Sequence, residues 1–190
     1  MMRRLGPTDY RDMPWKNGGG TTRELWKLPH PGDPARFLAR LSIASVAESG
    51  PFSVFPGVDR TLMLLQGEGM ALTREGAPYA VVDQPWRPFA FPGEVPLHCR
   101  LLGGPVLDFN LMVDRVLLEG SLEVLTLEAR EPRPLAGAGT VLLYGLRGQC
   151  WASGLSLAAQ ETLWLEAHGP LALLSETGAS VIAVRLQRRP

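Results

Sequence analysis

Residues 15–21, WKNGGGT, combine side chains and backbone groups that can bind a small polar molecule. The chain contains only two lysines and two asparagines, and one of each stands here, side by side. A lysine ammonium attracts an anion, and an asparagine amide both donates and accepts hydrogen bonds. Three successive glycines permit positive φ and a close approach of the backbone, whose N–H groups are further donors. We therefore predict a binding loop with contacts from Trp15, Lys16, Asn17, Gly18, Gly19 and Thr21.

Two alternatives apply to this loop. The glycines are also compatible with a tight turn before the next strand, although a turn does not explain the Trp-Lys-Asn sequence. Trp15 is interpreted either as an apolar wall of the site or as an anchor in the core. A nucleotide phosphate loop is not indicated, because the spacing differs from GxxxxGK[ST] and the lysine precedes the glycines.

Arg60 is a second candidate for anion binding. It follows a Pro-Gly turn at the start of an apolar strand, which places its guanidinium at the rim of a β-barrel. A guanidinium binds a carboxylate through two parallel hydrogen bonds. The alternative role for Arg60 is a surface ion pair with Asp59 or Glu68.

Asp108 and Asn110 belong to another strand pattern, in which polar and apolar residues alternate. They share one face of that strand, and we predict that this face borders the ligand, with Arg115 near its end. Asp108 has an alternative role, which is to hold Arg60 or Arg115 in place.

Composition narrows the classes of partner. The 190 residues are 45% hydrophobic and carry a formal net charge of zero, with a pI near 6.8. This balance gives no electrostatic basis for binding nucleic acid or an anionic membrane. Cys99 and Cys150 have no metal-site spacing and are expected to be buried free thiols. No apolar run has the length of a signal peptide core or a membrane span, so we expect a cytoplasmic protein.

Short alternating or apolar runs, separated by Gly and Pro, predict an all-β fold. The expected strands are 22–28, 37–47, 60–65, 70–74, 88–91, 97–102, 106–113, 122–127, 140–146, 162–165, 171–174 and 180–186. Residues 114–120 are expected to form one helical turn.

The two halves of the chain resemble each other. Residues 61–69 match 140–148 at an offset of 79, while 91–97 and 105–111 match 167–173 and 181–187 at an offset of 76. We predict a duplicated jelly-roll barrel with an N-terminal half at 1–128, a linker at 129–139 and a C-terminal half at 140–190. Only the first half carries the polar candidates, so the second is expected to serve packing.

Three segments together resemble the HutD/Ves family: residues 14–24 (PWKNGGGTTRE), 42–61 (SIASVAESGPFSVFPGVDRT) and 108–115 (DFNLMVDR). The resemblance starts near residue 10 and is strongest up to residue 115. It implies a bicupin fold assembled as a homodimer. It also implies, for some members, a link to histidine utilisation with N-formylglutamate or a related metabolite as ligand, whereas Ves-type members are tied to cold or stress responses.

Cupins that bind a transition metal use several histidines and a carboxylate. The histidines of this chain are His30, His98 and His168, and no two are spaced as a pair on one strand face. His98 is interpreted as a structural histidine or, alternatively, a lone ligand. We expect no metal and no cofactor.

Two function classes remain. The favoured one is a non-catalytic binder or sensor of a small acidic metabolite, because no nucleophile with a paired base is evident. The alternative is a metal-free cupin enzyme, an isomerase or hydrolase acting on a small carboxylic acid, with Asp108 or Glu24 as base. Neighbouring Arg and Lys are expected to lower the pKa of such a carboxyl and make it a weak base.

Overall fold

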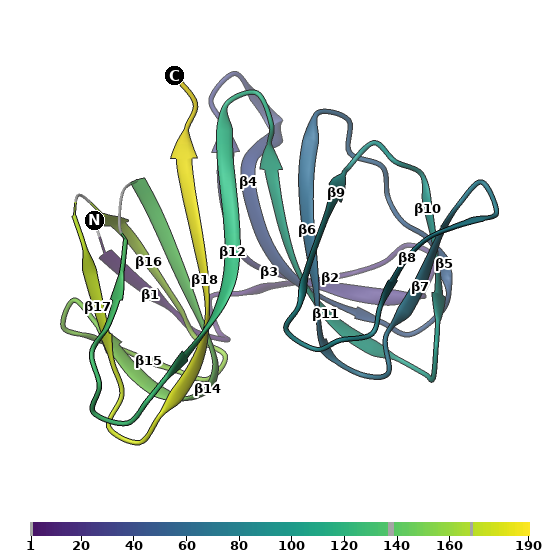
Figure 1. Ribbon diagram of the computed structural model, residues 1–190. Helices are drawn as coiled ribbons and strands as arrows, with labels where there is room; N and C mark the ends of the chain where they lie inside the picture. Colours follow the sequence, from purple (N-terminus) through teal and green to yellow (C-terminus); the bar gives the residue numbers. More distant parts are fainter. Residues whose placement is uncertain (1, 137–138, 168) are drawn as a thin grey trace. The chain divides into compact units, whose positions relative to one another are not determined.

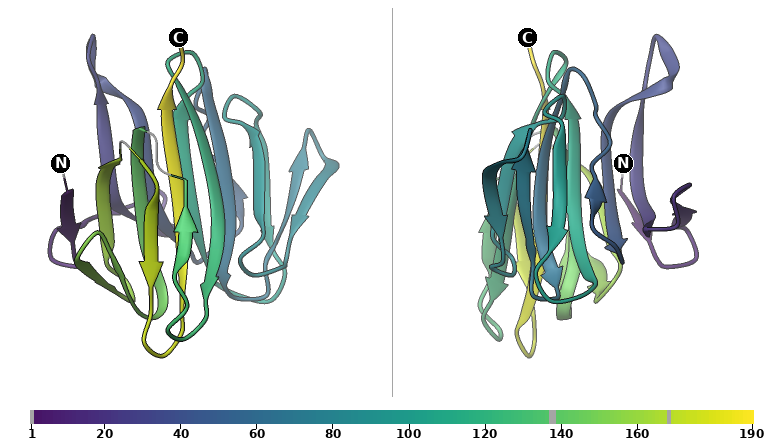
Figure 2. Two further views of the ribbon diagram at one scale, coloured as in Figure 1. Left: turned by 60° about the vertical axis from the view of Figure 1, so that its left-hand side comes forward. Right: turned by 90° about the vertical axis from the view of Figure 1, so that its right-hand side faces the viewer.

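The computed structural model describes residues 2–136, 139–167 and 169–190, and every regular element within these ranges is a β-strand. Figures 1 and 2 show strands and connecting loops from three sides. The all-β prediction is confirmed. The described residues contain no helix with the length and hydrophobicity needed to cross a membrane.

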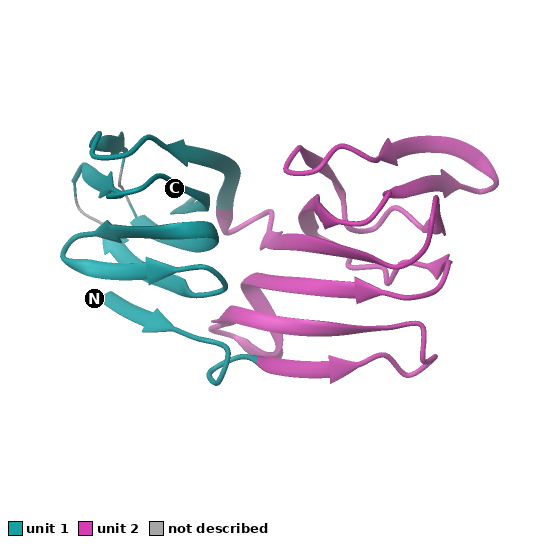
Figure 3. Ribbon diagram, turned by 90° about the horizontal axis from the view of Figure 1, so that it is seen from below, with its two compact units in different colours: residues 1–10, 119–190 teal, residues 11–118 magenta. Residues whose placement is uncertain are grey.

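The chain divides into two compact units, which are coloured separately in Figure 3. Unit 2 comprises Arg11–Leu118, and unit 1 comprises Met1–Tyr10 together with Glu119–Pro190. These limits differ from the predicted segments because residues 2–5 pair with residues 162–165, and the strand at 118–127 pairs with the strand at 179–188. In the predicted linker at 129–139, residues 137 and 138 lie outside the described residues.

Unit 2 contains two antiparallel sheets. The six-stranded sheet has the order β2 (Arg11–Pro14), β3 (Gly20–His30), β4 (Asp33–Val46), β11 (Val106–Asp114), β6 (Val58–Gln66) and β9 (Pro88–Pro92). The four-stranded sheet has the order β5 (Gly50–Pro51), β10 (Leu97–Leu101), β7 (Met70–Arg74) and β8 (Ala77–Val82). Their facing apolar side chains form one buried cluster, which includes Leu62, Leu64, Leu72, Leu97 and Val106.

Alternation along the strands explains this core. On β4 the residues Arg40, Ser42, Ala44 and Val46 share one face, because successive side chains of a strand point to opposite sides. The apolar members at the end of this series join the core, and the polar members at its start do not. One face of the sheet is therefore apolar at one end and polar at the other.

Unit 1 has a sheet whose main order is β1 (Met2–Leu5), β16 (Thr162–Ala167), β14 (Gly139–Ala152), β17 (Leu171–Leu174) and β13 (Arg133–Leu135). Three further strands are attached to it: β12 (Leu118–Leu127), β15 (Leu155–Ala158) and β18 (Ala179–Arg188). Its buried cluster is aliphatic, with Leu143, Leu163 and Leu173 fully enclosed.

Each of the segments predicted to be equivalent contains strand residues, and several also extend into the adjoining turns. Residues 61–69 begin in β6, which pairs with β11, and residues 140–148 lie in β14, which pairs with β18. His168, within the matched segment 167–173, lies outside the described residues. The duplication itself stays a prediction.

The helical turn expected at 114–120 is wrong. Residues 115–117 form a tight turn, in which Asp114 Oδ1 accepts hydrogen bonds from the N–H groups of Val116 (3.1 Å) and Leu117 (3.2 Å). A short side chain that satisfies two backbone donors allows the chain to reverse without a helix.

Candidate functional site

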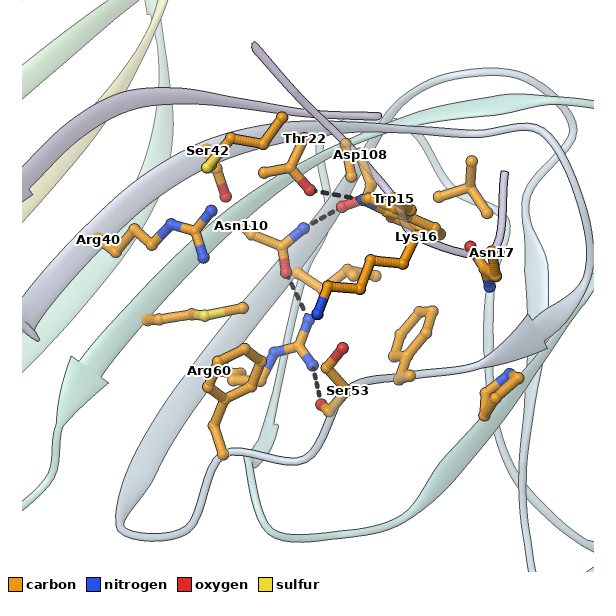
Figure 4. Close-up of a pocket in the computed structure, with 18 of the residues that line it drawn as sticks. Trp15, Lys16, Asn17, Thr22, Arg40, Ser42, Ser53, Arg60, Asp108 and Asn110 are labelled. Carbon is orange, nitrogen blue, oxygen red and sulfur yellow. Dashed lines mark hydrogen bonds between the residues drawn. The ribbon is translucent and has the colours of Figure 1, made fainter. Parts of the chain in front are cut away.

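Unit 2 contains a cavity of about 470 Å³ at the polar end of its six-stranded sheet. Figure 4 shows its labelled residues. It is lined by Met13, Pro14, Trp15, Lys16, Asn17, Thr22, Arg40, Ser42, Ala44, Val46, Pro51, Phe52, Ser53, Phe55, Arg60, Leu62, Asp108, Asn110 and Met112.

Strand register explains how residues distant in sequence meet here. β11 lies between β4 and β6, and Met112 pairs with Arg40 on one side and with Arg60 on the other. Two residues before Met112 on the same strand, Asn110 pairs with Ser42 and Leu62. Directly paired residues point to the same face of a sheet, so these rows form the floor of the cavity.

Arg60 is the most enclosed cation of the cavity, with only 7% of its surface exposed. Its guanidinium carbon lies 5.3 Å from the ring centre of Phe52, 5.7 Å from that of Phe55 and 5.0 Å from that of Phe91. Its Nη2 donates to Asn110 Oδ1 at 2.9 Å and its Nη1 to the Ser53 carbonyl at 3.3 Å. The alternative surface pairing with Asp59 or Glu68 does not occur.

Burial lowers the pKa of Arg60 to about 10, and the positive charge of Arg40 adds to this effect. The group still carries its charge at neutral pH. Three aromatic rings and two neutral oxygens surround the Arg60 guanidinium. Among the described residues, no carboxylate forms an ion pair with it. A buried cation of this kind favours an anion from outside the protein.

Asn110 connects Arg60 to Asp108. Its amide nitrogen donates to Asp108 Oδ1, while its amide oxygen accepts from Arg60. These two hydrogen bonds fix the orientation of the Asn110 side chain. Asp108 therefore supports Arg60 through Asn110 and also lines the cavity. It has no role in holding Arg115, which lies elsewhere.

The pKa of Asp108 is raised to about 7 by burial, which outweighs the opposing effects of Arg60 and Asn110. The sequence-based expectation of a lowered pKa is therefore wrong for this residue. Only 1% of Asp108 is exposed, and its hydrogen bond is to the Asn110 amide and not to the guanidinium itself. Loss of water therefore costs the carboxylate more than the attraction of Arg60 and the Asn110 hydrogen bond return.

The glycine loop holds Trp15 at the cavity. The indole Nε1 donates to Thr22 Oγ1 at 2.8 Å, and the N–H of Trp15 donates to the Gly20 carbonyl at 2.9 Å. A Cβ on Gly20 would lie 2.4 Å from the Ser45 carbonyl oxygen and 3.0 Å from the indole ring. Glycine is required there so that the tryptophan can pack closely. Trp15 both packs against the core and lines the cavity, so its two predicted roles coexist.

Lys16 and Asn17 are exposed residues at the mouth of the cavity. Figure 4 shows the Lys16 side chain directed into the cavity. Asn17 Oδ1 accepts a hydrogen bond from the Gly19 N–H at 3.1 Å, so this side chain helps to shape the loop as well as lining the cavity.

Four predicted contacts do not line the cavity: Gly18, Gly19, Thr21 and Arg115. The N–H groups of Gly18 and Gly19 bond to Trp15 and Asn17 within the loop, so they are not donors to a ligand. Thr21 neighbours Thr22 on the strand and so has the opposite orientation. Arg115 instead binds Asp59 at 2.7 Å and Glu94 at 2.6 Å on the surface.

Sequence reasoning missed several lining residues, most importantly Arg40 and Ser42. The signal was present, because these two polar residues alternate within the apolar run 37–47, as Asp108 and Asn110 do within theirs. The role of Phe52 and Phe55 around Arg60 had no comparable signal, since an aromatic residue in a loop indicates no particular partner.

The lining residues do not suit a transition metal. The cavity presents two guanidinium groups, an ammonium, amides, hydroxyls and one carboxyl, and no imidazole. His30 is partly exposed and His98 is exposed, both lie outside the lining, and His168 is not described. Among the described residues, no three His, Cys, Asp or Glu side chains gather as a metal-binding group.

Comparison with known proteins identifies the relatives of this chain. The family model described as HutD matches residues 7–183. The chain belongs to the HutD family. It is 35% identical to the protein Ves of Cronobacter sakazakii over 90% of this chain and 92% of that protein. It is 47% identical to a 21.2 kDa protein of the hutC 3' region of Pseudomonas putida, but that match covers only 57% of this chain and 56% of that protein.

Solved structures agree with the HutD assignment. A conserved protein of unknown function from Pseudomonas aeruginosa PAO1 has a TM-score of 0.85 at 35% identity, and HutD from Pseudomonas fluorescens SBW25 has 0.84 at 31%. Both matches cover the whole of each chain. The Escherichia coli pirin YhhW, solved with nickel(II), has a TM-score of 0.65 at 9% identity over 100% of this chain and 99% of that one, and so shows a shared cupin-like fold alone.

Replacement of Gly20 by alanine tests the close packing of the loop. We expect Gly20→Ala to lower the free energy of unfolding by roughly 1–3 kcal/mol, because the new methyl group collides with the Ser45 carbonyl and with Trp15. Gly19→Ala is the matched control, since a Cβ there meets neighbours at 3.5 Å or more. Urea denaturation measures both, and equal stability of the two variants would contradict this packing.

Asp108 makes stability depend on pH. Its carboxyl has a pKa of about 7 in the folded protein and an ordinary value of 3.8. Between these pH values the folded chain holds a proton that the unfolded chain has released, so the contribution of Asp108 to stability falls as pH rises. In wild type, this effect should lower the free energy of unfolding by on the order of 4 kcal/mol between pH 4 and pH 8. Asp108→Asn should lack this decrease, because asparagine does not ionise.

Urea denaturation of both proteins across this pH range measures the effect. The quantity of interest is the difference between variant and wild type, since other carboxyl groups contribute equally to both. A difference that stays constant from pH 4 to pH 8 would show that Asp108 ionises normally.

Proposed function

We propose that this protein is a non-catalytic binder or sensor of a small acidic metabolite, with N-formylglutamate or a related intermediate of histidine utilisation as the candidate. The observation that carries this proposal is the charge of the cavity. Lys16, Arg40 and Arg60 line it together with one carboxyl, that of Asp108, whose pKa is near 7. The cationic groups that line the cavity outnumber its one carboxyl, and an anionic ligand restores the balance.

Arg60 is the main contact in this proposal. Rings and hydrogen bonds hold the guanidinium in place before a ligand arrives, so little side-chain freedom is lost on binding. Lys16 at the mouth attracts the ligand and covers it, while the amide nitrogen of Asn17 donates to a formyl or amide oxygen.

The link to histidine utilisation is supported by relatives. The related Pseudomonas putida protein is described by its position in the hutC 3' region, and the similar structure from Pseudomonas fluorescens is a HutD. For the present chain, the chemistry of the cavity supports a carboxylate ligand independently of these names.

A catalytic role is the second candidate, and one observation favours it. A carboxyl with a pKa of about 7 is suited to accept and donate protons at neutral pH, and Asp108 lines the cavity. Glu24 is less suited, because it forms an ion pair with Arg40 and does not line the cavity. Turnover of a bound acid that is lost in Asp108→Asn, with binding retained, would establish this role.

We also propose that the chain is a bicupin in which the N-terminal repeat alone keeps a ligand site. Support comes from the corresponding pairing of β6 with β11 and of β14 with β18. At the positions that the offsets of 79 and 76 assign to Arg60, Asp108 and Asn110, the second pair has Gly139, Val184 and Leu186, none of which is polar in its side chain. A homodimer and a cytoplasmic location remain predictions.

Substitution of Arg60 tests the proposed function. We expect Arg60→Ala to weaken the binding of N-formylglutamate by roughly 1.5–3 kcal/mol, the range for hydrogen bonds to a charged group. Arg60→Lys should recover only part of this loss, since an ammonium cannot reproduce the planar fork of donors. Isothermal titration calorimetry with N-formylglutamate and with glutamate measures the effect.

Arg147→Ala serves as the control, because this exposed arginine belongs to the other unit. Its affinity should equal that of wild type. If Arg60→Ala binds every ligand of the wild type with unchanged affinity, the ligand site lies elsewhere and the proposal is wrong.

A further inference from the structure

Arg40 and Arg60 form a pair of cations across the floor of the cavity. They come from β4 and β6, and each is paired with Met112 on the intervening strand β11. Their Cα atoms are thus two strand spacings apart, roughly 10 Å. Figure 4 shows both guanidinium groups directed into the cavity.

The guanidinium of Arg40 has donors without a hydrogen-bond acceptor in the described part of the chain. Its Nε lies 3.0 Å from Glu24 Oε2, yet it is buried and lacks a hydrogen bond of acceptable direction. Among the described residues, no other acceptor bonds to this guanidinium. The side chain is only 16% exposed, so bulk water cannot fully replace the missing partners.

The charges of the two arginines interact. The positive charge of Arg40 contributes to the lowered pKa of Arg60, so the two groups are close enough for their like charges to repel. Asp108 attracts Arg60 electrostatically but forms no ion pair with it, and Glu24 approaches Arg40 from outside the lining. One bound negative charge next to Arg60 would leave the donors of Arg40 without an acceptor.

We propose that Arg40 binds a second anionic group of the same ligand and so selects dicarboxylates over monocarboxylates. This inference rests on the proposed function and names the residue that sets its ligand class. One carboxylate lies at Arg60 and the other at Arg40, and the methylene groups that join them pack on Met112. That side chain is 5% exposed, and its thioether provides an apolar, adaptable surface between the two charges.

Glutarate and its monoamide, glutaramate, test the proposal, because they differ in a single charge at nearly equal size. We expect wild type to bind glutarate roughly tenfold or more tightly than glutaramate, the factor that corresponds to one charged hydrogen bond. In Arg40→Gln this ratio should fall close to one, mainly through weaker binding of glutarate. Isothermal titration calorimetry of both ligands with both proteins gives the four affinities.

Two further variants distinguish loss of the Arg40 contact with the ligand from a general disturbance of the fold. Arg36→Gln removes an exposed arginine from the same strand, one that pairs with Asp114, and should leave the ratio unchanged. Arg40→Lys keeps a positive charge and should give an intermediate ratio, which also provides a readout if Arg40→Gln does not fold.

The outcomes distinguish this inference from the proposed function. If Arg60→Ala weakens binding but Arg40→Gln reduces the affinities for glutarate and glutaramate by the same factor, the acidic-metabolite site stands and the role of Arg40 is overturned. If the ratio depends on Arg40 but N-formylglutamate does not bind, the role of Arg40 stands and that candidate falls. If wild type binds no carboxylate at all, both proposals are overturned.

Discussion

The candidate site depends on the burial of one guanidinium. Arg60 is placed among three phenylalanine rings, where water cannot stabilise its charge fully. Its position is maintained by Asn110, whose amide in turn binds Asp108, and the three residues form a continuous chain of hydrogen bonds. In such surroundings the electrostatic interactions are stronger than in water, so both the cost of an unpaired charge and the gain from a bound anion increase.

The same burial affects the carboxyl at the other end of the chain. Asp108 is raised to a pKa of about 7, so the network gains or loses a charge near neutral pH. A proton on Asp108 adds to the net positive charge of the cavity and so favours an anionic ligand. One physical cause, loss of water, thereby shifts the pKa of Arg60 downward and that of Asp108 upward, although Arg60 keeps its charge at neutral pH.

The strands of the six-stranded sheet contribute both to the buried core and to the lining of the cavity. At one end of the six-stranded sheet, apolar residues form the core with the second sheet, while at the other end the same face carries Arg40, Ser42 and Asn110. The hydrogen-bonded strands β4, β11 and β6 hold these side chains in fixed positions relative to one another. The glycine loop adds Trp15, Lys16 and Asn17 over this floor, and Gly20 allows the indole to pack closely.

The sequence by itself determined the β architecture, singled out the loop Trp15–Asn17 that lines the cavity, and fixed the common face of Asp108 and Asn110, because turns, alternation and rare polar residues are local signals. Only the tertiary structure decided that Arg40 belongs to the site and Arg115 does not, since strand register and ion-pair partners join residues far apart in the chain. It also decided the protonation of Asp108. A pKa depends on how much water the whole fold excludes, and no local pattern of residues contains that information.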